Sequence, residues 1–158
     1  MDLDTKSLIQ LLSQYIYSKN KCKDYEERLL RIREELGTIK GNNISIVPRS
    51  QGGVNDGVAS FVYRVNEIEE QIAISRDSAA IKLLDVMSVL DLLESGSIGK
   101  RILEYKYIDN LKIYQIVDKI KYSRTSCYDY IDLAHRKLLG FAEVKEMIRA
   151  TKKQGQKK

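Results

Sequence analysis

The 158-residue chain contains no tryptophan, one proline and a single histidine. That histidine, His135, has no cysteine or second histidine beside it at the spacing that metal ligands or a Cys–His nucleophile pair require. Acidic residues are plentiful, but their pattern places them on charged helix faces and marks no shared pocket. We therefore expect no metal, no cofactor and no enzymatic activity, and a His135 that is partly exposed on its helix.

Cysteines and long apolar runs are scarce too. The only two cysteines, Cys22 and Cys127, lie far apart in the chain, which favours reduced thiols over a disulfide. The apolar pattern places Cys127 in the core, and we expect Cys22 to be exposed. No apolar run approaches the roughly 20 residues of a membrane span, and the first residues lack a leader pattern. These absences predict a cytoplasmic protein with no membrane partner.

Positive charge is concentrated in the second half of the chain. Residues 1–96 hold 12 Lys and Arg against 15 Asp and Glu, a net charge of −3. Residues 97–158 hold 15 against 7, a net charge of +8. A polyanion is the partner that this half would attract, although a solvated basic surface would give the same composition.

Apolar residues recur at helical spacing along most of the chain, so we expect an all-α fold. The first part reads as an N-terminal helical arm or hairpin, from Leu3 to about Ser18 and from about Asp24 to Leu36, ending at Gly37. Residues 37–57 hold five of the nine glycines and the only proline, and we expect a flexible linker there.

The helical pattern returns at Val58 and continues to Ser95. One long helix and a hairpin broken at Ser75–Ser78 both fit the pattern. Its second part is expected to bury one stripe of apolar residues: Ile81, Leu84, Met87, Leu90 and Leu93. A short helix then carries Ile98, Ile102, Leu103 and Tyr107. This organisation divides the chain into residues 1–57, 58–96, 97–142 and a basic tail, 143–158.

Residues 112–139 (KIYQIVDKIKYSRTSCYDYIDLAHRKLL) read as a helix-turn-helix. The first helix would bury a face that includes Ile116 and end before Lys121. The second would begin after an N-cap at Ser123, whose hydroxyl can accept from a free backbone N–H of the first turn. Its buried stripe would be Cys127, Ile131, Ala134 and Leu138, and its opposite face would carry Arg124, Thr125, Tyr128, Arg136 and Lys137.

That opposite face is the kind that a recognition helix offers to bases and phosphates. Asp129 and Asp132 oppose this interpretation, because phosphates repel carboxylates, although a carboxylate can accept from a cytosine amino group. An αα-hairpin in the core of a helical domain, with no DNA partner, remains the alternative.

The segment GKRILEYKYIDNLKIYQIVDKIKYSRTSCYDYIDLAHRKL resembles the helix-turn-helix of sigma-factor region 4. Together with the upstream PRSQGGVND and VNEIEEQI stretches, most of the chain is similar to small phage-encoded regulators of Gram-positive bacteria, the ArpU/RinA type. The resemblance implies a phage or prophage regulator that activates late genes on double-stranded DNA in the bacterial nucleoid. It also implies DNA contacts at the following positions: Lys112, Tyr114, Lys121, Tyr122, Ser123, Arg124, Thr125, Ser126 and Tyr128. The exposed face of the second helix adds two expected contacts, Asp129 and Arg136.

Three functions stay open at this point. A sequence-specific transcription regulator accounts for the basic half and the helix-turn-helix together. A small terminase subunit combines the same motif with assembly helices, so it would be a homo-oligomer. An adaptor that binds RNA polymerase or another protein would use the helix pair on a protein surface. If the first holds, a fragment from about Ser78 to Lys158 should fold and bind duplex DNA.

Overall fold

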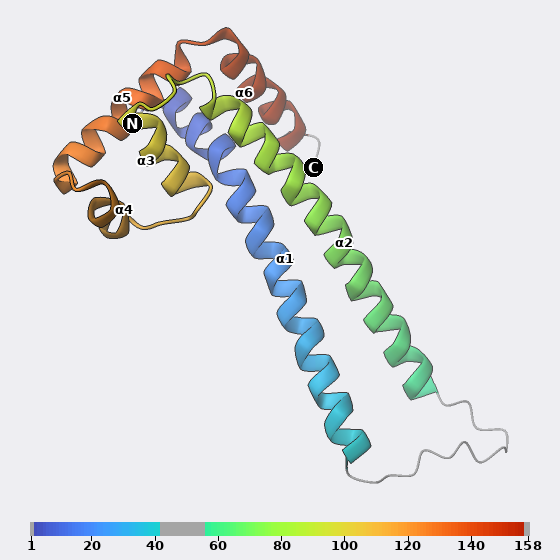
Figure 1. Cartoon of the computed structure of the whole chain (residues 1–158). Helices are drawn as coiled ribbons and strands as arrows, with labels where there is room; N and C mark the ends of the chain where they lie inside the picture. The colour runs from blue at the N-terminus through green and yellow to red at the C-terminus, as the bar shows by residue number, and fades with distance from the viewer. Residues whose placement is uncertain (1, 42–55, 157–158) are drawn as a thin grey trace, which may run out of the picture. The chain divides into compact units, whose positions relative to one another are not determined.

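A computed structural model of the chain contains six α-helices, and the part that it describes, residues 2–41 and 56–156, has no β-strand (Figure 1). The all-α prediction is therefore confirmed. The helices are α1 (Leu3–Gly41), α2 (Asp56–Leu90), α3 (Ile98–Tyr107), α4 (Ile113–Ile120), α5 (Arg124–Leu139) and α6 (Ala142–Gly155). Most of the expected linker, residues 42–55, lies outside the described residues.

The first helix is longer than the sequence pattern indicated. α1 runs without interruption through residues 19–23 and through Gly37, so the two expected helices are one and Gly37 does not end it. A glycine inside a helix costs about 1 kcal/mol relative to alanine, whereas a proline costs about 3 kcal/mol. Because α1 contains no proline, a single glycine is a weak reason for the helix to stop.

The second helix also differs from the expectation. α2 passes unbroken through Ser75–Ser78, which leaves the single long helix as the correct alternative. The expected buried stripe is wrong in part, because Ile81, Leu84 and Met87 are 59%, 64% and 43% exposed. Leu90 and Leu93 are buried as expected, and the other buried positions of α2 lie on a different face: Ile72, Ser75, Ala79, Val86 and Val89. α2 carries apolar residues on two faces, and periodicity does not predict which of them packs against other helices of the chain.

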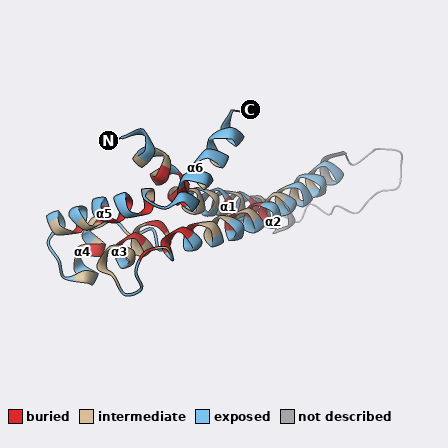
Figure 2. Ribbon diagram, turned by 90° about the horizontal axis from the view of Figure 1, so that it is seen from above, coloured by how far each residue is buried: buried red, intermediate tan, exposed pale blue. Residues whose placement is uncertain are grey.

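The chain divides into two compact units, of which the first comprises Met1–Ser18 and Ala79–Lys158. One hydrophobic core runs through this unit and draws residues from the start of α1, the end of α2 and α3 to α6. Fully buried members include Leu8, Leu12, Leu90, Ile102, Leu103, Ile116, Leu138 and Val144. The short C-terminal helices thus share their core with α1, which the sequence pattern did not predict (Figure 2).

The segment expected to be a basic tail is also part of this unit. It forms α6, and its Val144 and Ile148 are 0% and 6% exposed. Its basic residues, which include Lys152 and Lys153, lie toward the end of the helix, where cations interact favourably with the helix dipole.

The second unit, Lys19–Ser78, consists of the remaining parts of α1 and α2, which run side by side (Figure 1). Cys22, Leu29 and Ile72 are buried between these helices. The Cys22 thiol lies 3.9 Å from the backbone oxygen of Ile72, and only 7% of the residue is exposed. The expectation that Cys22 is exposed is therefore wrong, because α2 covers a position that looks solvent-facing in the charged sequence of α1.

No described helix is both long enough and apolar enough to cross a membrane.

Candidate nucleic-acid interface

The helix pair predicted from the sequence is present, and three residues join its helices. Lys121 ends α4 with a left-handed backbone, at φ 63°, and its N–H donates to the oxygen of Val117 at 2.9 Å. Glycine or asparagine usually holds this position, so a lysine there gave no sequence signal. Ser123 caps α5 as predicted: its Oγ accepts from the N–H of Ser126 at 3.1 Å, and its hydroxyl donates to the Ser126 Oγ at 2.8 Å.

The inner face of α5 matches the predicted stripe. Cys127, Ile131, Ala134 and Leu138 are all less than 5% exposed. Burial also raises the pKa of the Cys127 thiol, because the thiolate would lose its hydration. The structure thus fixes which face of α5 is turned away from the core, and it is the face predicted from the sequence.

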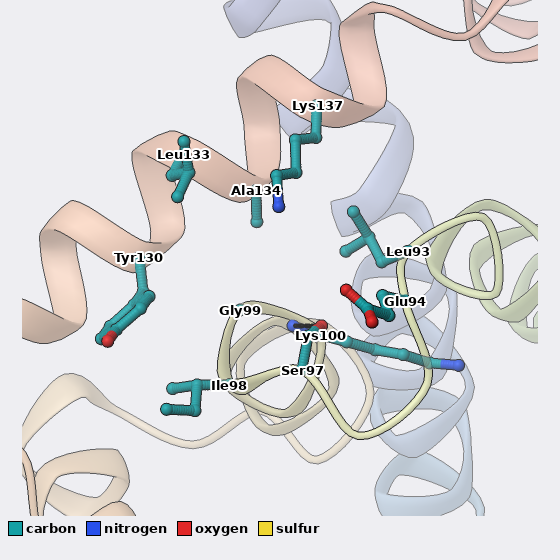
Figure 3. A pocket seen from close by; sticks show the side chains of 10 residues that line it. All are labelled: Leu93, Glu94, Ser97, Ile98, Gly99, Lys100, Tyr130, Leu133, Ala134 and Lys137. Atoms are coloured by element: carbon teal, nitrogen blue, oxygen red, sulfur yellow. Dashed lines mark hydrogen bonds between the residues drawn. The ribbon is translucent and has the colours of Figure 1, made fainter.

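α5 packs unusually close to the start of α3. Gly99 lies against Ala134, and a Cβ added at Gly99 would stand 3.2 Å from the Ala134 Cβ and 3.6 Å from the backbone oxygen of Tyr130. Both residues border a mainly apolar cavity of about 140 Å³ between the two helices (Figure 3). Two small residues therefore permit the approach that orients α5.

We expect Gly99→Val to push α3 and α5 apart and to destabilise the first unit by about 1 to 3 kcal/mol, the usual cost of overpacking. Gly155→Val is the matched control, because a Cβ at Gly155 meets nothing within 4 Å. Urea unfolding followed by circular dichroism measures both. Equal midpoints for the two variants would show that the α3–α5 approach tolerates a larger side chain.

The outer face of α5 exposes the side chains expected to touch bases. Arg124, Thr125, Tyr128, Asp129 and Arg136 are all exposed. The Arg124 guanidinium lies 5.8 Å from the centre of the Tyr128 ring, one helical turn further along. A cation–π contact of this kind is worth about 0.5 to 1 kcal/mol at an exposed site and limits the directions in which the arginine points.

The residues expected to flank the helix are exposed as well: Lys112, Tyr114, Lys121 and Tyr122. The Lys112 N–H donates to the side chain of Gln115 at 2.9 Å, which caps the start of α4. The Tyr122 ring meets that of Tyr130 edge-on at 5.7 Å. Ser126 is half-buried, and its bonds to Ser123 serve the cap, so its hydroxyl is the least accessible of the predicted contacts.

Sequence reasoning missed basic residues on the neighbouring helices. Lys106 of α3 borders two surface hollows, of about 400 and 580 Å³, together with Tyr128. Lys112 lines the first hollow and Arg136 the second, so cations from three elements surround Tyr128. Lys119 of α4 lies over the Tyr105 ring at 5.5 Å. For Lys106 the available signal was its place between two tyrosines, Tyr105 and Tyr107.

Carboxylates interrupt this basic surface. Asp129 and Asp132 of α5 are exposed, as the sequence pattern indicated, and so is Asp118 of α4. Between Lys112 and Leu139 six Lys and Arg stand against three Asp, a net charge of +3. The surface is therefore basic overall but carries acidic side chains at three points.

His135 lines the second of the two hollows beside Tyr128 but is almost completely buried. It is 4% exposed, and its Nε2 lies 3.1 Å from the hydroxyl of Tyr107, which is 2% exposed. Burial, aided by the nearby Lys106 ammonium, lowers the pKa of His135 to about 4, and burial raises that of Tyr107. The expectation of a partly exposed histidine near phosphates is therefore wrong, because this side chain points at α3.

The described residues contain no group of three or more His, Cys, Asp or Glu side chains that could hold a metal ion. The two hollows beside Tyr128 are lined by the cations Lys106, Lys112 and Arg136. The arrangement is suited to binding an anionic surface.

Comparison with known proteins gives one family. No curated protein and no solved structure matches the chain. The model of DUF1492, described as a protein of unknown function, matches residues 47–139. This match covers more than half of the chain and ends at the last residue of α5. The chain belongs to the DUF1492 family.

Proposed function

We propose that this chain is a sequence-specific DNA-binding regulator of transcription that reads duplex DNA with α5. The observation that carries the proposal is the exposed outer face of the first two turns of α5, where the Arg124 guanidinium lies over the Tyr128 ring directly after the turn 121–123. In helix-turn-helix proteins the start of the second helix contacts base edges in the major groove. An arginine there can donate two hydrogen bonds to one guanine.

The surrounding charge supports the same function. Lys106 comes from α3, and Lys112 and Lys121 cap the two ends of α4. These lysines would contact phosphates while Arg124 contacts a base. Phosphate contacts position a protein on the duplex, and base contacts specify the sequence. The three aspartates on the same two helices would reject wrong registers at a cost in overall affinity.

The resemblance to sigma-factor region 4 and to ArpU/RinA-type regulators supports a more specific role. In that role the chain activates late genes of a phage or prophage in the bacterial nucleoid and touches host RNA polymerase as well as the promoter. An adaptor that binds only protein is the second candidate, favoured by Tyr114 and Leu133, which are 61% and 50% exposed. Exposed apolar side chains of this kind are common at protein interfaces when they form a continuous patch.

Contacts to DNA bases and contacts to the DNA phosphates predict different effects of mutation. On a site selected from random duplexes, Arg124→Ala should weaken binding by about 1 to 3 kcal/mol, with little change on non-cognate DNA. Lys121→Ala should weaken binding to cognate and non-cognate DNA alike. It should also reduce the slope of log affinity against log salt by about 0.9, which corresponds to the loss of one phosphate contact. Fluorescence anisotropy over a salt series measures both quantities.

Asp129→Asn is the internal control, because removing a carboxylate that faces DNA should strengthen non-specific binding. If Arg124→Ala leaves cognate affinity intact, or if no duplex binds at low salt, α5 is not the reading element. The protein-binding function would then replace the present one.

A further inference from the structure

The two helices of the second unit present the same side-chain pattern to one face. α1 carries Glu26, Leu29, Leu30 and Arg33, and α2 carries Glu69, Ile72, Ala73 and Arg76 at identical spacing. The glutamate and the arginine of each set are seven residues apart, about two helical turns, so both lie on the same side of their helix. All eight residues line one groove of about 500 Å³ along the helix pair.

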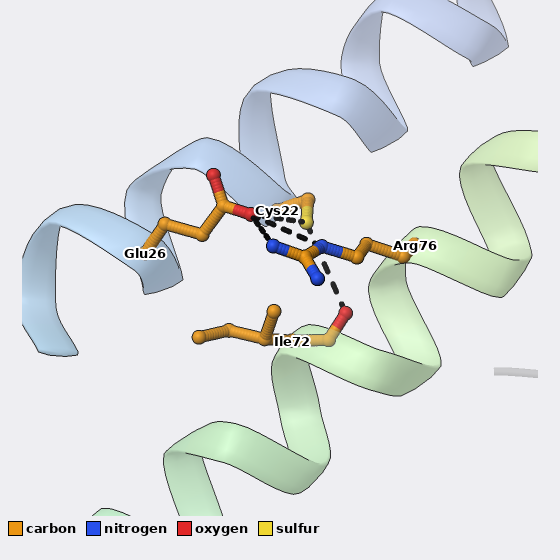
Figure 4. A network of polar contacts seen from close by, with 4 residues as sticks. All are labelled: Cys22, Glu26, Ile72 and Arg76. Carbon is orange, nitrogen blue, oxygen red and sulfur yellow. Dashed lines mark hydrogen bonds and ion pairs between the residues drawn. The ribbon is translucent and has the colours of Figure 1, made fainter.

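Opposite charges face each other at both ends of this groove, which we name the paired-helix groove. The Arg76 guanidinium meets the Glu26 carboxylate at 2.6 Å (Figure 4). The Arg33 guanidinium meets the Glu69 carboxylate at 2.8 Å. These four charged residues stand at the four corners of the groove. Each helix contributes one glutamate and one arginine, so the sign of the charge alternates from corner to corner.

The middle of the groove is apolar and incompletely covered. Leu29 and Ile72 form its floor and are 8% and 6% exposed. Leu30 is 58% exposed, and Ala73 beside it is exposed too. The second unit is one layer of two helices, and among its described residues only three apolar ones are buried: Cys22, Leu29 and Ile72. Helical units gain stability by burying an apolar face under a second layer, and this unit shows none.

We propose that the paired-helix groove binds the same groove of a second copy of the chain, so that two helix pairs form a four-helix bundle. The alternating corners are self-complementary. A two-fold axis along the groove places each α1 over the partner's α2, and an axis across the groove places Glu26 over the partner's Arg33. Either axis brings every guanidinium over a carboxylate, as an isologous interface requires.

The dimensions agree with a dimer. The described side chains of the unit span about 18 to 20 residues on each helix, which is about 30 Å, and two helices are about 20 Å wide. Such a face covers about 600 Å² per copy, so the total is near the 1,200 Å² at which stable interfaces begin. The leucines supply most of the free energy, because exposed ion pairs contribute little, and the charges select the register. This inference does not depend on DNA binding.

The mass of the full chain in solution tests the proposal. Wild type should sediment as a dimer, at twice the chain mass of 18.2 kDa. Leu30→Asp should sediment as a monomer, at the mass of one chain. The matched control is Ile74→Asp, which alters a residue of similar exposure, 54%, outside the groove and should stay dimeric. A monomeric wild type at micromolar concentration, a dimeric Leu30→Asp, or a monomeric Ile74→Asp would each overturn the assignment of this groove.

A charge exchange supplies a positive result that misfolding cannot imitate. In one variant, Arg33→Glu and Arg76→Glu make all four corners acidic; in the other, Glu26→Lys and Glu69→Lys make them basic. Each variant alone should be monomeric and helical, because its corners repel the same corners of a second copy. An equimolar mixture should recover the dimer mass. Failure of the mixture to associate, while both variants keep wild-type helicity, would overturn the proposal.

Discussion

Leu12→Ala should lower the free energy of unfolding of the first unit by about 2 to 5 kcal/mol, the range for truncating a fully buried leucine. Leu12 is 0% exposed and belongs to the core that α2 to α6 share. Domains of this size are stable by only about 5 to 15 kcal/mol in total. The variant should therefore show a much lower urea midpoint by circular dichroism, and DNA binding should fail with it.

Leu3 provides the matched control, because it lies on the same helix and is 69% exposed. Leu3→Ala should change stability by no more than about 0.5 kcal/mol, as surface substitutions usually do. If both substitutions cost the same, the start of α1 is not packed into this core. The distinction also bears on the fragment from about Ser78 to Lys158, which would lack Leu8, Leu11 and Leu12. We now expect that fragment to be poorly folded.

Periodicity identified α3, α4 and α5 of the first unit, but it missed α6 and did not show which helices pack together. The stripe of Cys127 and Ile131 was predictable, because the opposite face of α5 is strongly polar. α2 offered two apolar faces, and the sequence pattern favoured Ile81 and Leu84 where packing selects Val86 and Val89. Which of two apolar faces becomes buried depends on contacts distant in sequence, and single-chain periodicity contains no information about them.

The ends of the helices were predictable where side chains make specific hydrogen bonds. Ser123 has the sequence and the geometry of an N-cap. The chain reversal at Lys121 was not predictable in detail, because a lysine at positive φ is uncommon and the surrounding packing must impose it. At Gly37 the prediction failed in the other direction: glycine is typical of helix ends, but Gly37 lies inside α1.

The candidate interface was predictable as a list of exposed residues on α5, but not as a surface. Arg124 and Tyr128 are one turn apart, so their contact follows from helical geometry. Lys106 comes from α3 and joins them only through the fold. His135 was misplaced because a polar residue near a basic face suggests exposure, whereas Tyr107 gives it a buried hydrogen-bond partner.

That buried histidine should make the stability of the first unit depend on pH. The pKa of His135 is about 4 in the folded chain, against an ordinary value of 6.5. Between these values the unfolded state binds a proton that the folded state does not, so the free energy of unfolding falls as the pH falls. The full loss, complete near pH 4, is about 3 kcal/mol, of which about 2 kcal/mol should be lost by pH 5.

The loss of stability above pH 5 can be assigned to His135, because the chain has no other histidine and most carboxylates protonate at lower pH. The groups that lie near the ring are the Lys106 ammonium, which opposes its protonation, and the Asp132 carboxylate, which favours it. Burial is the largest cause of the low pKa. Removing the Tyr107 hydroxyl in Tyr107→Phe should therefore lower stability at every pH but preserve most of the pH dependence.

His135→Gln keeps a hydrogen-bonding atom near the position of Nε2 but does not titrate in this range. Its stability should be nearly constant between pH 7.5 and 5, whereas wild type should lose about 2 kcal/mol over the same interval. Urea unfolding at closely spaced pH values, with salt held constant, measures the difference. A wild-type curve as flat as that of His135→Gln would mean that His135 accepts a proton in the folded chain as easily as in the unfolded one, and hence that water reaches the ring between α3 and α5.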